Sequence, residues 1–123
     1  MPWTYHQRSG VMRGPNGEYY VGYSGAPGLY KNNPDAEDVS FMGPIPRGHW
    51  RINFPAYNNL HTGHYTLDLT PVGHNAHGRN NFRIHGESSA HPGASSEGCI
   101  ILPLVGRQAI VHSGDDTLIV VRD

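Results

Sequence analysis

The chain has 123 residues, the usual length of one domain, and its 37% hydrophobic residues are enough for a modest core. Nine Lys and Arg against ten Asp and Glu give a formal net charge of −1, so the basic excess expected of a nucleic-acid-binding protein is absent. No apolar run approaches the ~20 residues of a membrane span. The single cysteine, Cys99, excludes an internal disulfide and a cysteine-rich zinc site.

The first third of the chain predicts short strands separated by turns. Three segments alternate apolar and polar residues or are rich in aromatic and β-branched residues: Trp3–Gln7, Gly10–Arg13 and Glu18–Tyr23. The turn sequence Gly14-Pro15-Asn16-Gly17 separates the last two, so we expect an opening β-meander. A loop follows over Ser24–Pro34, and Asp35–Val39 predicts one helical turn capped by Asn33 or Asp35.

The rest of the chain predicts further strands and one helix. Strand patterns recur in four segments: His49–Phe54, Tyr65–Leu69, Phe82–His85 and Thr117–Val121. The alternation places Trp50, Ile52 and Phe54 on one face of their strand. Pro103 suits a first helical position, which makes Leu104–His112 the one clear helix. We therefore expect residues 1–123 to form a single, mostly β domain, a sandwich or barrel with one or two short helices.

The segment from Phe82 to Leu102 has the most chemical content. A predicted strand ends at His85, and the 13 residues 86–98, rich in Ser, Gly and Ala, return the chain at Cys99. A cysteine is a strong nucleophile only as the thiolate, and a nearby imidazole can take its proton or stabilise the ion pair. We therefore predict that Cys99 is a nucleophile and His85 its acid–base partner. The alternative is that Cys99 is a small buried hydrophobe, which the following Ile-Ile-Leu also fits.

Small residues beside this pair suit an acyl-transfer site. Gly98 allows a tight turn before Cys99, and the backbone N–H groups of Cys99 and Gly98 can face the oxyanion of an intermediate. The second imidazole nitrogen needs a partner that orients the ring, and the candidates are Ser96 and a backbone carbonyl near Gly86. The predicted catalytic residues are therefore Cys99, His85 and Ser96, supported by the backbone at Gly98 and Gly86.

His-Gly, a gap in the mid-teens and Ser-x-Gly-Cys-Ile together resemble the active-site signature of L,D-transpeptidase catalytic domains. Motifs further upstream resemble more closely the L,D-transpeptidase effectors of type VI secretion, antibacterial toxins delivered into a rival's periplasm. These motifs follow in order along most of the chain: Asn16-Gly17, Gly22-Tyr23-Ser24-Gly25, Asn32-Asn33-Pro34, Gly43-Pro44-Ile45-Pro46-Arg47-Gly48, Gly78-Arg79 and Phe82-Arg83-Ile84-His85-Gly86. The resemblance implies an L,D-transpeptidase-like fold related to a β-sandwich.

The resemblance also implies a cysteine enzyme that acts on peptidoglycan stem peptides and needs no cofactor. It implies L,D-carboxypeptidase action, which removes the terminal D-Ala after meso-diaminopimelate from tetrapeptide stems, and exchange of that D-Ala for another D-amino acid. Both reactions begin when Cys99 attacks the amide carbonyl and His85 protonates the leaving amine. Water, a free D-amino acid or another stem then resolves the thioester.

Two positions depart from the general L,D-transpeptidase signature: Glu97 stands where a His is usual, and Ile101 where an Arg is frequent. That Arg contacts the substrate carboxylate in the housekeeping enzymes, so another cation is needed. Three arginines could substitute for it: Arg79, Arg83 and Arg107. We take Tyr23 and Arg79 as substrate-binding candidates, with Tyr23 and the Gly43–Gly48 loop lining the groove. The other interpretation of Tyr23 is a core aromatic in a strand.

Two other classes of function remain open. A zinc-dependent peptidoglycan hydrolase would use imidazole ligands, and six histidines come into question: His61, His64, His74, His77, His85 and His91. The two pairs spaced by three residues lie in loop-like segments without a Glu-plus-His motif, so we interpret them as exposed loop residues and predict no metal site. A non-catalytic wall-binding or immunity-binding module would stack aromatic residues on sugars, although such residues also fill β cores. The candidates are Trp3, Tyr19, Tyr20 and Trp50.

Location and partners follow from the substrate that the resemblance implies. Peptidoglycan lies outside the cytoplasmic membrane, yet the chain shows no secretory signal and leaves its cysteine free. An injected effector that acts in the target-cell periplasm reconciles these facts. The producing cell would then need a periplasmic immunity protein, which we expect to block the cleft between His85 and Cys99. We expect a monomer without nucleic-acid partners.

Overall fold

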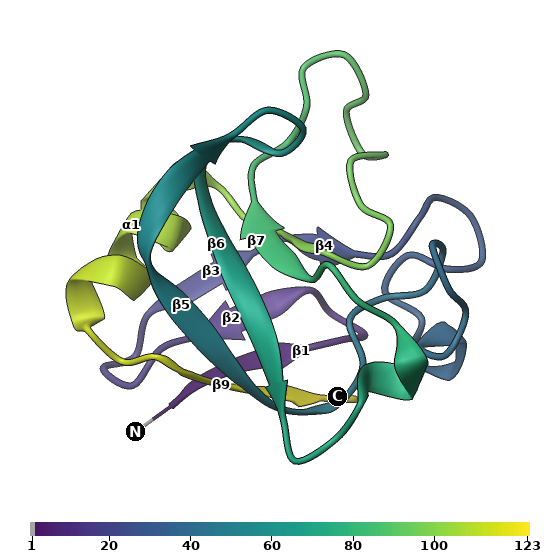
Figure 1. The fold of residues 1–123 in the computed structure, drawn as a ribbon, viewed down its shortest axis with the longest axis horizontal. Helices are drawn as coiled ribbons and strands as arrows, with labels where there is room; N and C mark the ends of the chain where they lie inside the picture. Colours follow the sequence, from purple (N-terminus) through teal and green to yellow (C-terminus); the bar gives the residue numbers. More distant parts are fainter. Residues whose placement is uncertain (1) are drawn as a thin grey trace.

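The computed structural model describes residues 2–123, and its fold is mostly β, as predicted (Figure 1). The strands are β1 Trp3–His6, β2 Val11–Arg13, β3 Tyr19–Val21, β4 Tyr23–Ser24, β5 Gly48–Asn59, β6 Gly63–Val72, β7 Arg83–His85, β8 Ile100–Ile101 and β9 Thr117–Val121. The helical elements are the 3-10 turns η1 Pro34–Ala36 and η2 Ala76–Gly78 and the helix α1 Leu104–Ser113. No helix within residues 2–123 is long and apolar enough to cross a membrane.

The strands form one nearly closed, barrel-like sheet. Their order is β3-β2-β1-β9-β5-β6-β7-β8-β4, with β1–β9 and β7–β8 paired in parallel and the other pairs antiparallel. The two end strands, β3 and β4, are separated in the chain only by Gly22. A Cβ on Gly22 would lie 1.7 Å from the carbonyl oxygen of Ile101, so this crossing requires glycine.

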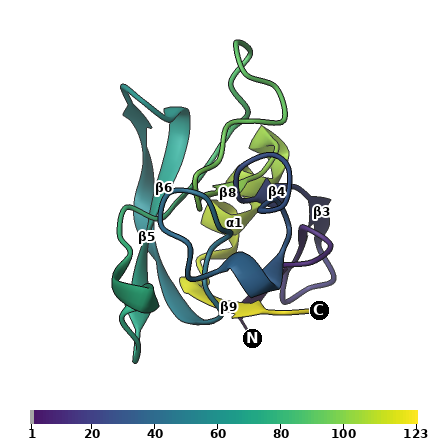
Figure 2. The same cartoon turned by 90° about the vertical axis from the view of Figure 1, so that its right-hand side faces the viewer.

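Alternation of apolar residues along the strands builds the core on the inner face of this sheet. Inward residues of β1, β5 and β9 are at most 2% exposed: Trp3, Tyr5, Trp50, Ile52, Leu118 and Val120. Helix α1 packs on the same core through Ile110, and its Gly106 lies against the ring of Tyr20 on β3. Figure 2 shows α1 between the β5–β6 hairpin on one side and β3 on the other.

Most of the predicted elements are confirmed. The opening meander is present as β1–β2–β3, Asn33 caps η1 by accepting the Asp35 N–H at 3.0 Å, and the predicted helix corresponds to α1. Pro103 is the N-cap of α1, one position earlier than predicted. The placement of Phe54 on the inner face is wrong, since the register of β5 on β6 shifts between Asn53 and Tyr57 and leaves Phe54 36% exposed.

Candidate active site

Parallel pairing of β7 with β8 brings the two predicted catalytic residues to one place. His85 ends β7, and Cys99 immediately precedes β8. The pairing sets Ile84 opposite Ile100, so Cys99 lies beside Arg83 at the start of β7. Since alternate residues of a strand share a face, the side chains of Arg83 and His85 project from the same face of the sheet. All three residues line one cavity.

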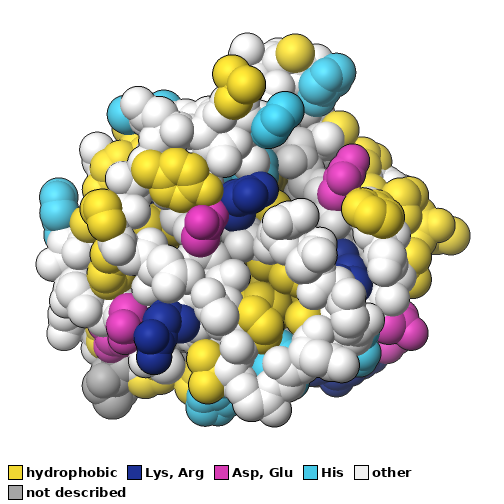
Figure 3. Space-filling view, in the orientation of Figure 1, with side chains coloured by type: hydrophobic (Ala, Val, Ile, Leu, Met, Phe, Trp, Pro, Cys, Tyr) yellow, Lys and Arg dark blue, Asp and Glu magenta, His cyan; other side chains and the backbone are white. Residues whose placement is uncertain are grey.

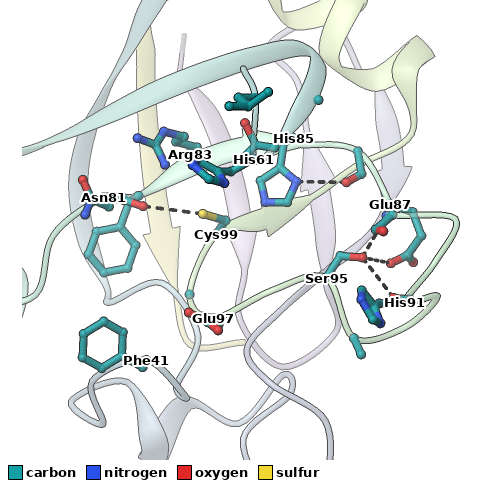
Figure 4. A pocket seen from close by; sticks show the side chains of 18 of the residues that line it. Phe41, His61, Asn81, Arg83, His85, Glu87, His91, Ser95, Glu97 and Cys99 are labelled. Atoms are coloured by element: carbon teal, nitrogen blue, oxygen red, sulfur yellow. Dashed lines mark hydrogen bonds between the residues drawn. The ribbon is translucent and has the colours of Figure 1, made fainter. Parts of the chain in front are cut away.

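This cavity is an open groove of about 1160 Å³, formed by segments far apart in the sequence (Figure 4). Its walls come from the loop at Phe41, the tip of the β5–β6 hairpin, residues 78–83, the loop 86–98 and the start of α1. Besides Cys99, its charged and titratable lining residues are Arg79, Arg83, Arg107, Glu87, Glu97, His61, His64, His85 and His91. Histidines gather over the hairpin tip and the 86–98 loop (Figure 3). With three arginines against two glutamates, the groove favours an anionic ligand.

The Cys99 thiol is partly exposed to the groove and is protonated at rest. Its Sγ donates a hydrogen bond to the backbone oxygen of Asn81 at 3.6 Å. Burial raises the pKa of the thiol, and the backbone N–H and guanidinium of Arg83 offset this only in part. The site therefore holds a neutral thiol that must lose its proton before it can attack.

The His85 imidazole is oriented by the neighbouring peptide group. Its Nδ1 lies 2.9 Å from the Gly86 carbonyl oxygen, and because a carbonyl only accepts, Nδ1 carries the proton and Nε2 is left as an acceptor. Burial lowers the pKa of His85, and the positive charges of Arg107 and Arg83 lower it further against the raising effect of the Gly86 bond. A neutral imidazole with a free Nε2 can act as a general base.

Cys99 and His85 face the same space without bonding to each other in this state (Figure 4). Within residues 2–123, the thiol bonds to Asn81 and the imidazole to Gly86, and no hydrogen bond joins the two side chains. Catalytic contacts are often loose before substrate binds. Proton transfer between Cys99 and His85 therefore stays a prediction.

Ser96 shapes the turn before Cys99 and does not orient His85. Its hydroxyl donates to the Cys99 carbonyl at 2.6 Å and accepts the N–H groups of Gly25 at 2.9 Å and Gly98 at 3.1 Å. The sequence offered two candidates for the group that orients the His85 ring, and in the structure the Gly86 carbonyl is the one bonded to it.

Gly98 is required by its conformation and its surroundings. Its φ is +133°, and a Cβ would lie 2.6 Å from Nη2 of Arg79. Its N–H is already bonded to Ser96, which removes it as an oxyanion donor in this state. The N–H of Cys99 itself is the remaining candidate from the sequence prediction.

Tyr23 is not a wall of the groove. It is absent from the cavity lining, and its hydroxyl lies beneath the 86–98 loop, where it donates a short hydrogen bond to Glu87 and accepts the Ser95 N–H at 3.1 Å. Ser95 Oγ donates to the same Glu87 carboxylate at 2.7 Å. Tyr23 therefore holds the loop from below. The Gly43–Gly48 loop is also outside the lining.

The three candidate arginines differ in what they bind. Arg79 is buried and donates only to backbone oxygens, those of Glu37, Pro44, Gly43 and Glu97. Arg107 likewise donates to backbone oxygens, those of Leu102, His64 and Tyr65. Arg83 instead pairs its Nε with Asp68 at 3.1 Å, on the surface of the groove. The predicted substrate-binding role of Arg79 is therefore replaced by a structural one, and Arg83 is the cation best placed for a ligand.

The histidines of the zinc alternative divide between the groove, which His61, His64, His85 and His91 line, and the segment of His74 and His77 outside it. No group of three or more His, Cys, Asp and Glu side chains within residues 2–123 is placed to hold a metal ion. His61, His64 and His77 are exposed, as predicted, while His74 is half-buried against Trp50. Trp3 and Trp50 are core residues, and Tyr19 is exposed but away from the cavity.

Several residues of the groove were not singled out from the sequence, among them Phe41, Leu60 and Asn81, and neither was Asp68, the partner of Arg83. They lie in turns or on distant strands that only the closure of the sheet brings to Cys99. Asn81 has a φ of +63°, a conformation that asparagine tolerates, and this aims its carbonyl at the thiol. In the sequence, the only sign of this role for Asn81 was its place in an Asn-Asn pair, which is typical of a turn.

The fold and site define a small, nearly closed β protein with a lone cysteine and a buried histidine beside one open groove. The profile of the Tlde1 domain matches residues 18–114, and the chain therefore belongs to the Tlde1 domain family, a family of type VI secretion effectors. No curated protein matches the chain. The match confirms the predicted resemblance to type VI secretion effectors.

Proposed function

We propose that this protein is a cysteine acyl-transfer enzyme that cuts peptidoglycan tetrapeptide stems between meso-diaminopimelate and the terminal D-Ala. The observation that carries the proposal is the placement of His85 on β7 and of Cys99 directly before the paired strand β8, two residues apart in register, in one open groove. The neutral states of both side chains support a mechanism in which His85 acts as the base.

In the first half of the reaction, Nε2 of His85 takes the proton of Cys99 Sγ, and the thiolate adds to the amide carbonyl carbon. The Cys99 N–H stabilises the oxyanion. The carbon–nitrogen bond then breaks, the leaving D-Ala amine takes the proton from His85, and a thioester remains on Cys99.

In the second half, water or the amine of a free D-amino acid attacks the thioester. His85 accepts a proton from the attacking group and returns it to the Cys99 sulfur as the carbon–sulfur bond breaks. Water gives carboxypeptidase action, and a D-amino acid gives exchange. Arg83 is the proposed partner of the carboxylate that both D-Ala and the replacing amino acid carry.

The direct test is incubation of the purified protein with tetrapeptide muropeptides, followed by mass spectrometry. We expect loss of D-Ala, and a new mass when another D-amino acid is added in excess. Cys99→Ala should abolish both reactions while its thermal unfolding stays near that of the wild type. D-Ala release by the alanine variant would overturn the assignment of the nucleophile.

The effector family also supports a site of action in the target-cell periplasm and a protective partner in the producing cell. We expect growth arrest when the chain is expressed in a sensitive bacterium with an added export signal, and none when it stays in the cytoplasm. Cys99→Ala with the same signal is the matched control. Equal toxicity in both compartments would contradict periplasmic action.

A further inference from the structure

Phe41 presents a large apolar side chain to the groove from a backbone conformation that bulky residues rarely adopt. Its φ is +65°, in the left-handed region, and the residue is 72% exposed. Strain of this kind persists only where the surroundings enforce it, and it is concentrated at ligand clamps and active sites. Because the ring gains little from core burial, the stability of the fold does not account for a phenylalanine here.

Hydrogen bonds and close packing fix the chain around Phe41. The N–H groups of Met42 and Gly43 both donate to the Val39 carbonyl, at 3.3 and 2.9 Å. Gly43 packs so tightly that a Cβ would lie 1.7 Å from the Ala36 carbonyl oxygen. The backbone that carries the exposed ring is therefore held in place by the surrounding loop.

Arg79 joins the Phe41 loop to the turn that carries Cys99. Its guanidinium donates to carbonyl oxygens on both segments: Glu37, Gly43, Pro44 and Glu97. Phe41 consequently keeps a fixed position relative to the thiol. In Figure 4, Phe41 lies at the end of the pocket away from His61 and His85, where it extends the groove beyond the site of bond cleavage.

We propose that Phe41 is a stacking platform for a sugar ring of the glycan strand that carries the stem peptide; this inference rests on the proposed function. The cavity of about 1160 Å³ exceeds the roughly 300–1,000 Å³ of a site for one small ligand, so it has room for more than a short peptide. Neither residue that flanks the cut bond has a ring: D-Ala offers a methyl group, and meso-diaminopimelate offers a flexible methylene chain that ends in charged groups. A pyranose ring offers a flat C–H face that matches an aromatic side chain.

The test compares two ligands on the non-cleaving Cys99→Ala protein by titration calorimetry: the tetrapeptide alone and the same tetrapeptide on its disaccharide. We expect the disaccharide form to bind about tenfold tighter. Adding Phe41→Gly should remove this preference and leave the affinity for the bare peptide unchanged, while Phe41→Tyr should keep the preference. Tyr19→Ala, which removes an exposed aromatic residue outside the cavity, is the matched control.

Phe41→Gly also separates a ligand role from a structural one. Glycine adopts this φ without strain, so the variant should unfold at the same temperature as the parent or higher. Equal affinity for the two ligands, no binding of either, or a preference that survives Phe41→Gly would overturn the platform. If the wild type cleaves neither ligand but Cys99→Ala shows the preference, the proposed reaction fails and the sugar site stands.

Discussion

Burial sets the resting charge of both Cys99 and His85. It raises the pKa of the thiol and lowers the pKa of the imidazole, so both groups are neutral near pH 7. A preformed thiolate–imidazolium pair would need the opposite shifts. The residues therefore favour a cysteine that becomes a nucleophile only when substrate brings Sγ and Nε2 together.

The pH dependence of turnover follows from the imidazole. A base must be neutral in the free enzyme, and the pKa of His85 is lowered, so the acidic limb of kcat/KM should fall below the ordinary histidine value of about 6.5. Alkylation of Cys99 by iodoacetamide at pH 7 should also be slower than that of a free cysteine. A limb above pH 7 or rapid alkylation would contradict the neutral resting pair.

We expect Arg83 to bind the carboxylate of the substrate. Removing a charge-assisted hydrogen bond costs about 1.5–3 kcal/mol, so Arg83→Gln should lower kcat/KM on a carboxylate-ended stem by about 10- to 100-fold. A stem that ends in an amide should be little affected, and the two substrates are compared by mass spectrometry of the released residue.

Arg8→Gln is the control for this prediction. Arg8 pairs its Nε with Asp123 at 3.1 Å, the same contact that Arg83 makes, but it lies outside the groove. Its loss should leave discrimination between the two stems intact. If Arg83→Gln also leaves that discrimination intact, another group binds the carboxylate.

At the scale of elements, the site depends on loops tied together by a few buried polar groups. Ser96 connects Gly25, beside β4, with the two residues that precede β8. Arg79 connects the same turn with the Phe41 loop. Tyr23 supports the 86–98 loop through Glu87 and Ser95. The strands determine where each loop begins, and the hydrogen bonds of these side chains determine the path that the loop follows.

Ser96→Ala tests this arrangement. Ser96 is 1% exposed and its hydroxyl has three partners. Loss of the hydroxyl should therefore lower the free energy of unfolding by about 1–3 kcal/mol and reduce turnover by displacing Cys99. Ser89→Ala, in the exposed part of the neighbouring loop, is the control and should be near neutral. Denaturant unfolding measures both, and an unchanged Ser96→Ala stability would refute the role of the turn.

At the scale of the whole molecule, Glu37 links three distant parts of the chain. Its carboxylate accepts hydrogen bonds from Gln7 at 2.9 Å, Arg47 Nε at 2.8 Å and His77 at 2.8 Å. Burial works to raise the pKa of Glu37, but these bonds prevail and lower it to about 2.

This shift predicts how stability depends on pH. A lowered carboxyl pKa stabilises the fold fully above the ordinary value of 4.5, and the contribution disappears as pH falls towards 2. Glu37→Gln should cost about 1–3 kcal/mol at pH 7 and little near pH 2. Urea unfolding across this range measures the difference, and parallel pH curves for the two proteins would contradict the link.

The sequence by itself determined the mostly β class, the positions of most strands along the chain, the helix after Pro103 and the strand that ends at His85. These features are local: alternation, turn residues and proline act over a few neighbouring positions. Phe54 was misplaced because a register shift depends on the partner strand, which the local pattern does not contain.

The tertiary structure decided which residues surround the nucleophile. Closure of the sheet through Gly22 turned Arg79 and Arg107 towards backbone carbonyls and left Arg83 at the groove, although the three arginines look alike in the sequence. It likewise placed Ser96 in the turn before Cys99, Tyr23 against the 86–98 loop and Phe41 exposed at the groove. A polar side chain bonds to whatever the folded chain brings within about 3 Å of it, and that depends on residues tens of positions away.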